Sequence, residues 1–180
     1  PVVSLPTIAA LTPPDVQVTI CDENVETIDF DQPCDVVGMT AMNVQAERAI
    51  EIARGFRARG RTVVIGGPYA TLCPDRLKPH ADVLFLGEAE HTWPRFVEEW
   101  RQGSHRAVYE QVDKIDLHRS PAPRFELLKL DRYAGGTLQT SRGCPYDCEF
   151  CDIVLESMSG RKVRSKSPVQ VVREAEALAR

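Results

Sequence analysis

The stretch Thr62-Val63-Val64-Ile65-Gly66-Gly67-Pro68 contains the clearest fold signal in the chain. Its β-branched core ends at two glycines and a proline, which is typical of a buried strand in a parallel sheet. Similar apolar runs lie on either side, at residues 35–39 and 83–86, and helical patterns separate the runs. Because strands alternate with helices, the sequence predicts an α/β fold with a doubly wound parallel sheet.

The periodicity also predicts which residues of each helix face the core. In a helix over 43–59 these are Ala49, Ile52, Ala53 and Phe56, and in a helix over 90–101 they are Trp93, Phe96, Val97 and Trp100. A capping box at Ser167–Gln170 predicts a helix that turns Val171, Val172, Ala175 and Leu178 inward. The remaining expected elements are helices at 5–11 and 74–77 and strands at 16–20, 107–109 and 137–140.

Three strand ends are followed by distinctive loops, Thr40-Ala41-Met42-Asn43, Gly66-Gly67-Pro68-Tyr69 and Gly87-Glu88-Ala89-Glu90. Ligands of open α/β sheets bind at the carboxyl ends of the strands. Glycine at such an end lets the backbone approach a bulky ligand closely. Plain turn chemistry explains the same glycines, so the residues alone leave both readings open.

A second signal is the stretch from Thr140 to Cys151, in which Cys144, Cys148 and Cys151 follow a Cys-x3-Cys-x2-Cys pattern. Iron–sulfur clusters are held by cysteine thiolates, usually four of them. Three thiolates without a nearby fourth Cys or His would leave one iron open to a small ligand. A structural zinc site needs four closed ligands, and a disulfide framework needs a secreted, loop-rich chain, so both fit this pattern less well.

The composition narrows the classes of partner. The 180 residues are 43% hydrophobic and 27% charged, as in an ordinary globular chain, and the net charge of -4 argues against a general nucleic-acid binder. No apolar run approaches the length of a membrane span. Six cysteines, three of them in one loop, suit a reducing compartment. We therefore expect a cytoplasmic protein without a nucleic-acid partner or a membrane span.

The cysteine stretch resembles the radical S-adenosylmethionine (SAM) superfamily, whose signature is Cys-x3-Cys-x-aromatic-Cys, with Phe150 as the aromatic residue. The resemblance implies that Cys144, Cys148 and Cys151 hold a 4Fe–4S cluster and that SAM chelates its open iron. It also implies that Tyr146 and Phe150 contact SAM. Residues 135–180 would then form the first strand–helix unit of a partial (β/α)6 radical SAM barrel.

The preceding part resembles the cobalamin-binding, Rossmann-like domain of many radical SAM enzymes, which has a Ser-x-Leu-like loop after one strand and Gly-Gly after the next. Thr40-Ala41-Met42 and Gly66-Gly67 match these two elements in order. The Asp-x-His-x-x-Gly motif, which ligates cobalt in other cobalamin domains, does not occur in the chain. The resemblance implies that cobalamin is bound by Thr40, Ala41, Met42, Asn43, Gly66, Gly67, Pro68, Tyr69, Gly87 and Glu88.

The same resemblance implies a division of the chain. Residues 1–105 would be the cobalamin-binding domain, with its first strand expected before Pro1, residues 106–134 a linker, and residues 135–180 the start of the radical SAM domain. We expect this chain alone to be catalytically inactive. The basic run from Gly160 to Lys166 is interpreted first as a solvated loop, and second as a charge complement to an anionic ligand.

As to function, the resemblance implies reductive cleavage of SAM and cobalamin-assisted methylation of an unactivated carbon in a small molecule such as a lipid or a tetrapyrrole. An electron donor such as flavodoxin or ferredoxin would be needed. Cys151-Asp152-Ile153-Val154, together with Gly160-Arg161-Lys162 and Arg164, is similar to hopanoid methylases. Two other hypotheses stay open: a radical SAM cyclase or other rearrangement without methyl transfer, and a non-catalytic cobalamin or metal carrier.

Overall fold

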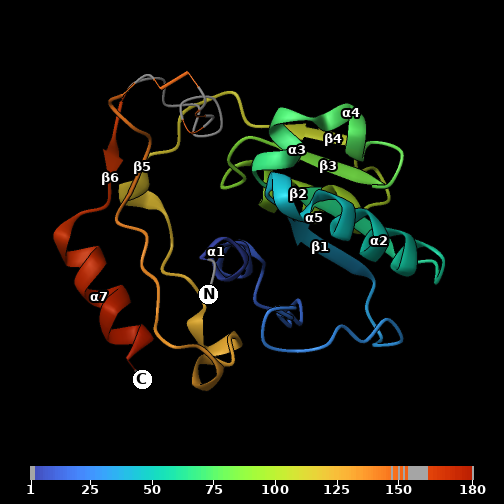
Figure 1. The fold of residues 1–180 in the computed structure, drawn as a ribbon, viewed down its shortest axis with the longest axis horizontal. Helices are drawn as coiled ribbons and strands as arrows, with labels where there is room; N and C mark the ends of the chain where they lie inside the picture. The colour runs from blue at the N-terminus through green and yellow to red at the C-terminus, as the bar shows by residue number, and fades with distance from the viewer. Residues whose placement is uncertain (1–2, 147, 150, 152, 154–161, 180) are drawn as a thin grey trace. The chain divides into compact units, whose positions relative to one another are not determined.

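The computed structural model describes residues 3–146, 148, 149, 151, 153 and 162–179. They divide into two compact units (Figure 1). One unit is Asp29–Asp113, and the other joins the segment up to Ile28 with the segment from Lys114 onward. This division differs from the expected boundaries at residues 105 and 134, because a strand beyond residue 105 still pairs within the sheet of the first unit.

The unit Asp29–Asp113 contains one parallel sheet of four strands, which confirms the predicted α/β class. The strands are β1 (Val36–Thr40), β2 (Thr62–Gly66), β3 (Val83–Leu86) and β4 (Val108–Glu110), in the order β1-β2-β3-β4. The ladders pair Thr40 with Gly66 and Leu86 with Glu110. The strands therefore end in step, and the loops that follow them leave the sheet at one edge.

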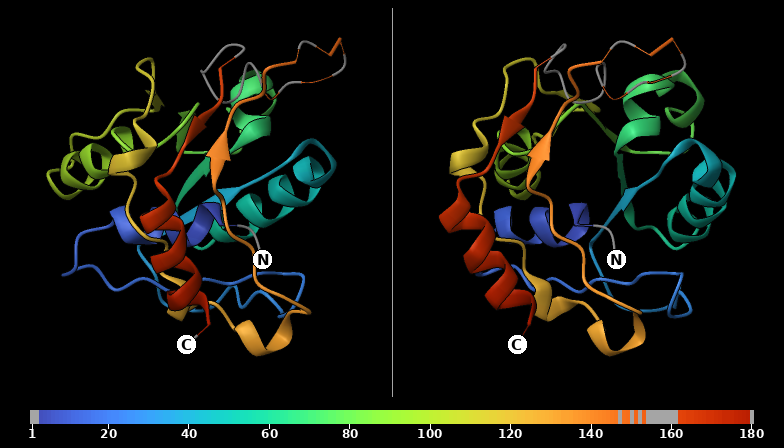
Figure 2. Two further views of the ribbon diagram at one scale, coloured as in Figure 1. Left: turned by 90° about the vertical axis from the view of Figure 1, so that its left-hand side faces the viewer. Right: turned by 60° about the vertical axis from the view of Figure 1, so that its left-hand side comes forward.

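Helices cover both faces of this sheet. They are η1 (Asn43–Gln45), α2 (Ala46–Arg57), α3 (Pro68–Leu72), α4 (Pro74–Leu77) and α5 (Thr92–Arg101). Figure 2 shows α2 and α5 on opposite sides of the strands. α5 packs against β1 closely, since a Cβ built on Gly38 would lie 3.6 Å from Trp93 Cη2. The predicted doubly wound arrangement is therefore seen.

The buried helix faces differ slightly from the predicted ones. α2 buries Ala46, Ala49, Ile50, Ala53 and Phe56, whereas Ile52 is only half-buried. Ile52 lies at the flank of the buried stripe, whose centre runs through Ala46, Ala49, Ile50 and Ala53. On α5, Phe96 and Val97 are buried and Trp93 and Trp100 are half-buried. Trp93 packs against Phe85 and Phe96 in an aromatic cluster.

The second unit is built mostly from short elements. They are α1 (Ser4–Leu11), η2 (Leu117–Arg119), η3 (Phe125–Leu127), η4 (Leu130–Arg132), β5 (Ser141–Arg142), β6 (Arg164–Ser165) and α7 (Pro168–Leu178). Side chains join its two sequence segments: Tyr133 Oη donates to Asp22 Oδ2 at 2.6 Å, and Lys129 forms an ion pair with Glu26. In addition, Arg124 N donates to the carbonyl oxygen of Pro6 at 3.0 Å.

Two predicted strands of this unit were wrong. Residues 16–20 alternate between half-buried and exposed, as predicted, but they pair with no strand among the described residues. Residues 137–140 form no strand either: the ladder begins only at Ser141, antiparallel to β6, although Thr140 O accepts from Lys166 N at 2.9 Å. A period of two fixes where side chains point, but a strand also needs a neighbouring backbone. The expected opening of a parallel barrel is therefore not seen.

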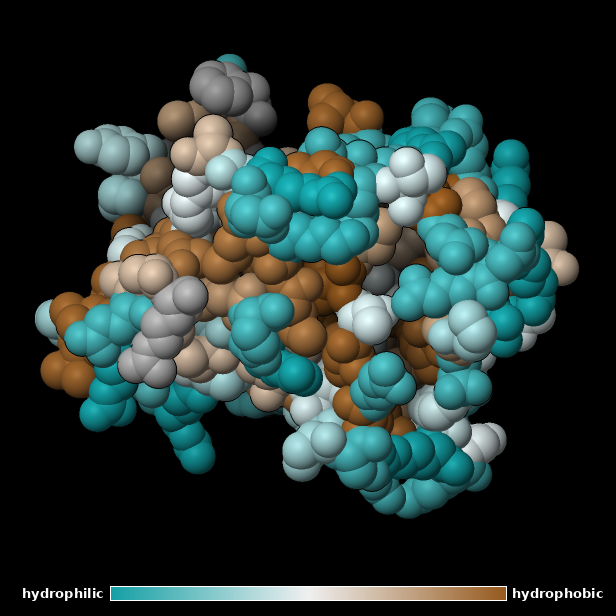
Figure 3. All heavy atoms as spheres, turned by 90° about the horizontal axis from the view of Figure 1, so that it is seen from below, coloured by the Kyte–Doolittle hydropathy of each residue, from teal (hydrophilic) through white to brown (hydrophobic). Residues whose placement is uncertain are grey.

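The orientation of α7 is a further correction. Glu174 is the residue that this helix buries, whereas Val172, predicted to face inward, is 56% exposed. Val169 is exposed as well, and Figure 3 shows hydrophobic side chains at the surface over a broad area seen from below. The capping box at Ser167 and Gln170 was predicted correctly.

Among the described residues, no helix combines the length and the apolar character that a membrane crossing requires.

A hydrogen bond at the edge of the sheet gives a first prediction. Tyr109 Oη donates to Glu99 Oε2 at 2.5 Å and accepts from Arg106 N at 3.1 Å. Burial and the bond to Glu99 raise the pKa of Tyr109, and the bonds from Tyr109 and Arg95 lower the pKa of Glu99. Tyr109→Phe should lower the midpoint of thermal unfolding by roughly 2–5 °C, because the ring stays and both hydrogen bonds are lost.

The same variant should also change how the thermal stability of the protein depends on pH. Because the pKa of Glu99 is lowered in the folded state, the stabilisation is present above the unfolded value of about 4.3 and disappears as the pH falls through the folded value. Thermal unfolding from pH 7 to pH 3 should therefore separate the wild type from Tyr109→Phe at neutral pH and bring them together in acid. A constant difference over the whole range would contradict this assignment.

Candidate functional site

The three loops singled out in the sequence lie together at the carboxyl edge of the sheet. Residues 40–43 follow from the end of β1, residues 66–69 from the end of β2, and residues 87–90 from the end of β3. The pairing of Thr40 with Gly66 brings the first two loops to the same level. All three predicted loops therefore occupy the position at which parallel sheets bind ligands.

Main-chain hydrogen bonds join the first loop to the second. Ala41 N donates to Gly66 O at 3.4 Å, and Tyr69 N donates to Ala41 O at 3.0 Å. Ala41 is 1% exposed and Tyr69 is 8% exposed. The main chain of these two predicted site residues therefore holds the loops together, and their side chains are buried and do not contribute to the exposed surface.

Gly67 is required by the protein itself. Its φ of +89° lies in the region that favours glycine, and a Cβ at this position would lie 2.3 Å from Thr40 Oγ1. The sequence left two readings of this glycine open, turn chemistry and close approach of a ligand, and the structure gives the positive φ and the contact with Thr40 as a reason within the protein itself. A larger residue here would therefore disturb the loops before any ligand binds.

Thr71 is a site residue that the sequence analysis missed. Its hydroxyl donates to Gly67 O at 3.2 Å and accepts from Gly87 N at 2.9 Å, so one side chain joins the second loop to the third. The available signal was Pro68, which begins α3, because a threonine in the next turn commonly bonds back to the carbonyl four residues earlier.

Gln111, the residue after β4, was also missed, and its side chain contacts His91, the residue after the third loop. Its Nε2 donates to Asp113 O at 2.7 Å and lies 3.2 Å from Nδ1 of His91. A carbonyl oxygen only accepts, so the amide nitrogen of Gln111 faces Asp113 O. The side chain of His91 does not cap α5, although the residue stands at the N-cap.

The exposed surface at the first loop combines apolar and polar side chains. Met42 is 53% exposed and Val44 is 92% exposed, and Asn43 lies exposed between them. Met42 N donates to Gln45 Oε1 at 3.0 Å, which fixes the turn into η1. Met42 and Asn43 are among the residues that the resemblance assigns to cobalamin, and they present an apolar and a polar side chain at this surface.

The cysteine stretch lies in the other unit. Cys144 and Cys151 are half-buried, Cys148 is exposed, and all three are free thiols. Within the described part of the chain, no group of three or more His, Cys, Asp or Glu is close enough together to hold a metal ion. The donor chemistry suits a cluster, but the structure does not bring these thiols together. Tyr146 is 72% exposed, and Phe150 lies outside the described residues.

The basic run after the cysteines is not a fully solvated loop. Lys166 forms a buried ion pair with Glu174, and Arg164 Nη1 donates to Ile115 O at 2.7 Å. Lys162 is exposed, whereas Gly160 and Arg161 lie outside the described residues. The first interpretation of this run was therefore wrong for Lys166 and Arg164. Glu174 neutralises the charge of Lys166 within the protein, so Lys166 does not serve as a charge complement to an anionic ligand.

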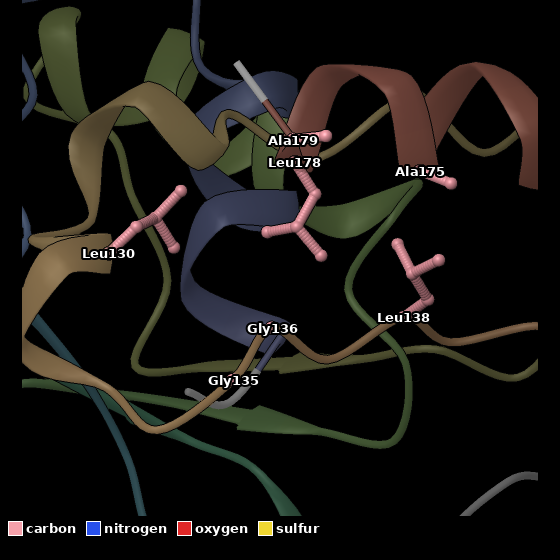
Figure 4. Close-up of a pocket in the computed structure, with 7 residues that line it drawn as sticks. All are labelled: Leu130, Gly135, Gly136, Leu138, Ala175, Leu178 and Ala179. Carbon is pink, nitrogen blue, oxygen red and sulfur yellow. The ribbon is translucent and has the colours of Figure 1, made fainter.

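An open hollow of about 430 Å³ lies between the C-terminal turns of α7 and the segment before the cysteines (Figure 4). Its lining is Leu130, Gly135, Gly136, Leu138, Ala175, Leu178 and Ala179. Leu178 points toward Gly136, where a Cβ would lie 2.4 Å from Leu178 Cδ2. The lining contains none of the predicted site residues, so the hollow is a packing feature of α7.

The Thr71 bridge predicts a measurable effect on ligand binding. Thr71→Val keeps the shape of the side chain but removes both hydrogen bonds, which should let the second and third loops move apart. We expect hydroxocobalamin to bind the full-length protein about tenfold more weakly, equivalent to about 1.4 kcal/mol. Equilibrium dialysis measures this affinity. Thr71→Ser retains the hydroxyl and should bind as the wild type does; equal affinity in all three proteins would contradict the role of Thr71.

Comparison with known proteins identifies the family. The model of the B12 binding domain matches residues 7–97, a range that includes all three loops. The chain is 38% identical over 99% of its length to an uncharacterized methyltransferase of Synechocystis sp. and 31% identical over 92% to bacteriochlorophyllide d C-8(2)-methyltransferase of Chlorobaculum tepidum. It is 32% identical over 93% to hopanoid C-2 methylase of Rhodopseudomonas palustris. The chain spans 33%, 38% and 32% of the lengths of these relatives. Over residues 7–97, the chain therefore belongs to the B12 binding domain family.

Proposed function

We propose that the protein is a cobalamin-dependent radical SAM methyltransferase that methylates an unactivated carbon of a small molecule. The observation that supports this most directly is the match of the B12 binding domain to the residues that form the three-loop edge. The names of the relatives, bacteriochlorophyllide and hopanoid methylating enzymes, support methyl transfer as the reaction class and a tetrapyrrole or a lipid as the substrate class.

In this proposal the three-loop edge binds cobalamin. Polar groups for the ligand would come from Thr40, Asn43 and Glu88, and an apolar surface from Met42. The backbone would approach the ligand at Gly66, Gly67 and Gly87. The loops themselves would be held in place by Ala41, Pro68 and Tyr69. When bound, cobalamin supplies a cobalt centre that carries a methyl group. The apolar side chains of Met42 and Val44 would exclude water beside the ring, and the loop hydrogen bonds would hold it in one orientation.

Cys144, Cys148 and Cys151 are proposed to hold a 4Fe–4S cluster, with Tyr146 and Phe150 against SAM. The support is the spacing of the three thiols and their free state. The cluster, when bound, supplies the electron that cleaves SAM. An electron donor such as flavodoxin or ferredoxin would deliver that electron. Free thiols that must stay reduced fit a cytoplasmic location.

One observation favours a second candidate, a cobalamin carrier without radical chemistry. The cobalamin edge is built wholly within the unit Asp29–Asp113, whereas the three thiols are not gathered in the described structure. A carrier would bind cobalamin and use neither cluster nor SAM. The two experiments below separate the two candidates, because each measures cluster or SAM chemistry independently of cobalamin binding.

The cluster gives the first test. The full-length protein, reconstituted with iron and sulfide without oxygen, should contain about four irons and four sulfides per chain at this site. Substituting Cys144, Cys148 or Cys151 by Ala should abolish the cluster, because three thiolates are the minimum set. Cys73→Ala removes a half-buried free thiol of the other unit and is the matched control. Stoichiometric zinc, or an intact cluster in all three variants, would refute the cluster.

Methyl transfer gives the second test and needs no knowledge of the substrate. The reconstituted full-length protein, with bound cobalamin, a low-potential reductant and SAM labelled in its methyl group, should form labelled methylcobalamin and 5′-deoxyadenosine. Chromatography of the quenched mixture measures both products. Formation of 5′-deoxyadenosine without methylcobalamin would favour a radical rearrangement, and formation of neither would favour the carrier.

A further inference from the structure

Gln111 is buried at the carboxyl edge of the sheet, directly after β4. The ladder pairs Leu86 with Glu110, so the chain leaves β4 at the level at which the third loop leaves β3. The main-chain nitrogen of Gln111 donates to Leu86 O at 3.0 Å, and only 3% of the residue is exposed. A polar side chain therefore lies below the surface at a fourth strand end, beside the three that the candidate site includes.

The amide nitrogen of Gln111 is held within the protein, whereas the amide oxygen is not. Nε2 donates to Asp113 O at 2.7 Å and lies 3.2 Å from Nδ1 of His91. Oε1 is buried and has no hydrogen-bond partner among the described residues. Turning the amide over would set Oε1 against Asp113 O, and two acceptors form no hydrogen bond. The orientation of the amide is therefore fixed, and its acceptor stays without a donor.

A buried acceptor without a donor costs free energy, because folding removes the water that bound it in the unfolded chain. Most buried polar atoms of native proteins have a partner, so each exception requires an explanation. Oγ1 of Thr92, the residue after His91, is also buried and has no partner within the described part of the chain. Both atoms belong to segments that follow β3 and β4, at the edge where parallel sheets bind ligands. A ligand that brings a donor would explain the oxygen of Gln111.

Cobalamin has donors of the required kind. Its ring system, the corrin, carries primary carboxamides on propionamide arms around its rim, and an amide N–H is an ordinary partner for an amide oxygen. Such an arm extends beyond the edge of the ring, so its amide can enter a site that lies below the protein surface. Side chains at the edge would have to shift as the arm enters, and rotamer changes of this kind are common on binding.

We propose that Gln111 is a cobalamin-binding residue, and that its Oε1 accepts a hydrogen bond from the primary amide of a propionamide arm of the corrin. This inference rests on the proposed function, because it takes cobalamin as the ligand of the three-loop edge. It extends the site from three strand ends to four. Asp113 O contributes by holding the amide nitrogen, which leaves the oxygen for the ligand.

The test changes the protein and the ligand at the same contact. The full-length protein is compared with Gln111→Met, which removes the acceptor from a side chain of similar length, and with Gln111→Glu, which keeps an acceptor oxygen. Gln102→Met is the matched control, because Gln102 is an exposed glutamine that bonds to Glu98. The ligands are hydroxocobalamin and its purified monocarboxylic acids, each with one propionamide hydrolysed to a carboxylate. Equilibrium dialysis at neutral pH measures each affinity without SAM or turnover.

We expect the wild type to bind one of the acids about tenfold more weakly than hydroxocobalamin, equivalent to about 1.4 kcal/mol, because a carboxylate has no proton to donate to Oε1. Gln111→Met should bind hydroxocobalamin about tenfold more weakly and should no longer discriminate against that acid, since the shared contact is gone. Gln111→Glu should discriminate more strongly than the wild type, because two carboxylates then face each other. Gln102→Met should match the wild type with every ligand.

The outcomes separate this inference from the proposed function. A wild type that does not bind hydroxocobalamin would refute cobalamin binding at the edge, and the inference with it. A wild type that binds hydroxocobalamin but binds every acid equally tightly would overturn the role of Gln111 alone. Unchanged ratios of affinity in Gln111→Met would do the same, because a purely structural residue weakens all these ligands alike. If Gln111→Met does not fold, Gln111→Glu decides: stronger discrimination supports the role, and unchanged discrimination refutes it.

Discussion

The in-step pairing of β1 with β2 is the constraint on which the candidate site depends. Thr40 and Gly66 are ladder partners, so the chain leaves both strands at the same level. The turn that follows needs a positive φ at Gly67, and the missing side chain there makes room for Thr40 Oγ1. A shift of one residue in this register would separate the first two loops and reverse the faces of one strand.

The three-loop edge contains two kinds of residue with different tasks. Ala41, Tyr69 and Thr71 are hydrogen-bonded within the protein and determine where the loops lie. Met42 and Val44 extend outward and offer contact surface. A ligand that binds at this edge therefore meets a framework that is already assembled, and less ordering of the loops opposes binding. This division explains why residues that touch no ligand belong to the binding site.

The unit that contains the cysteines follows a different physical rule. Its regular elements are short, and besides buried apolar side chains such as Leu117 and Phe125, polar contacts join its two segments, among them Tyr133 with Asp22 and Lys129 with Glu26. Directional contacts of this kind fix angles and rotations that apolar packing leaves open.

The sequence by itself determined the elements whose signals are local. The four parallel strands, α4, the capping box of α7 and the three loops at the carboxyl edge were all readable, because turn residues, caps and apolar runs act within a few positions. The cysteine spacing was readable for the same reason, as was the family resemblance that the B12 binding domain match supports.

Only the tertiary structure decided the features that depend on distant partners. Residues 16–20 have a strand pattern but no paired neighbour, and Gln111 acquires a role only because β4 lies beside β3. On α7, the pattern favoured Val172, but an ion pair with a lysine eight residues away buries Glu174. Propensity and periodicity describe one segment at a time, whereas ladder pairing and the burial of charge depend on which group the fold places opposite.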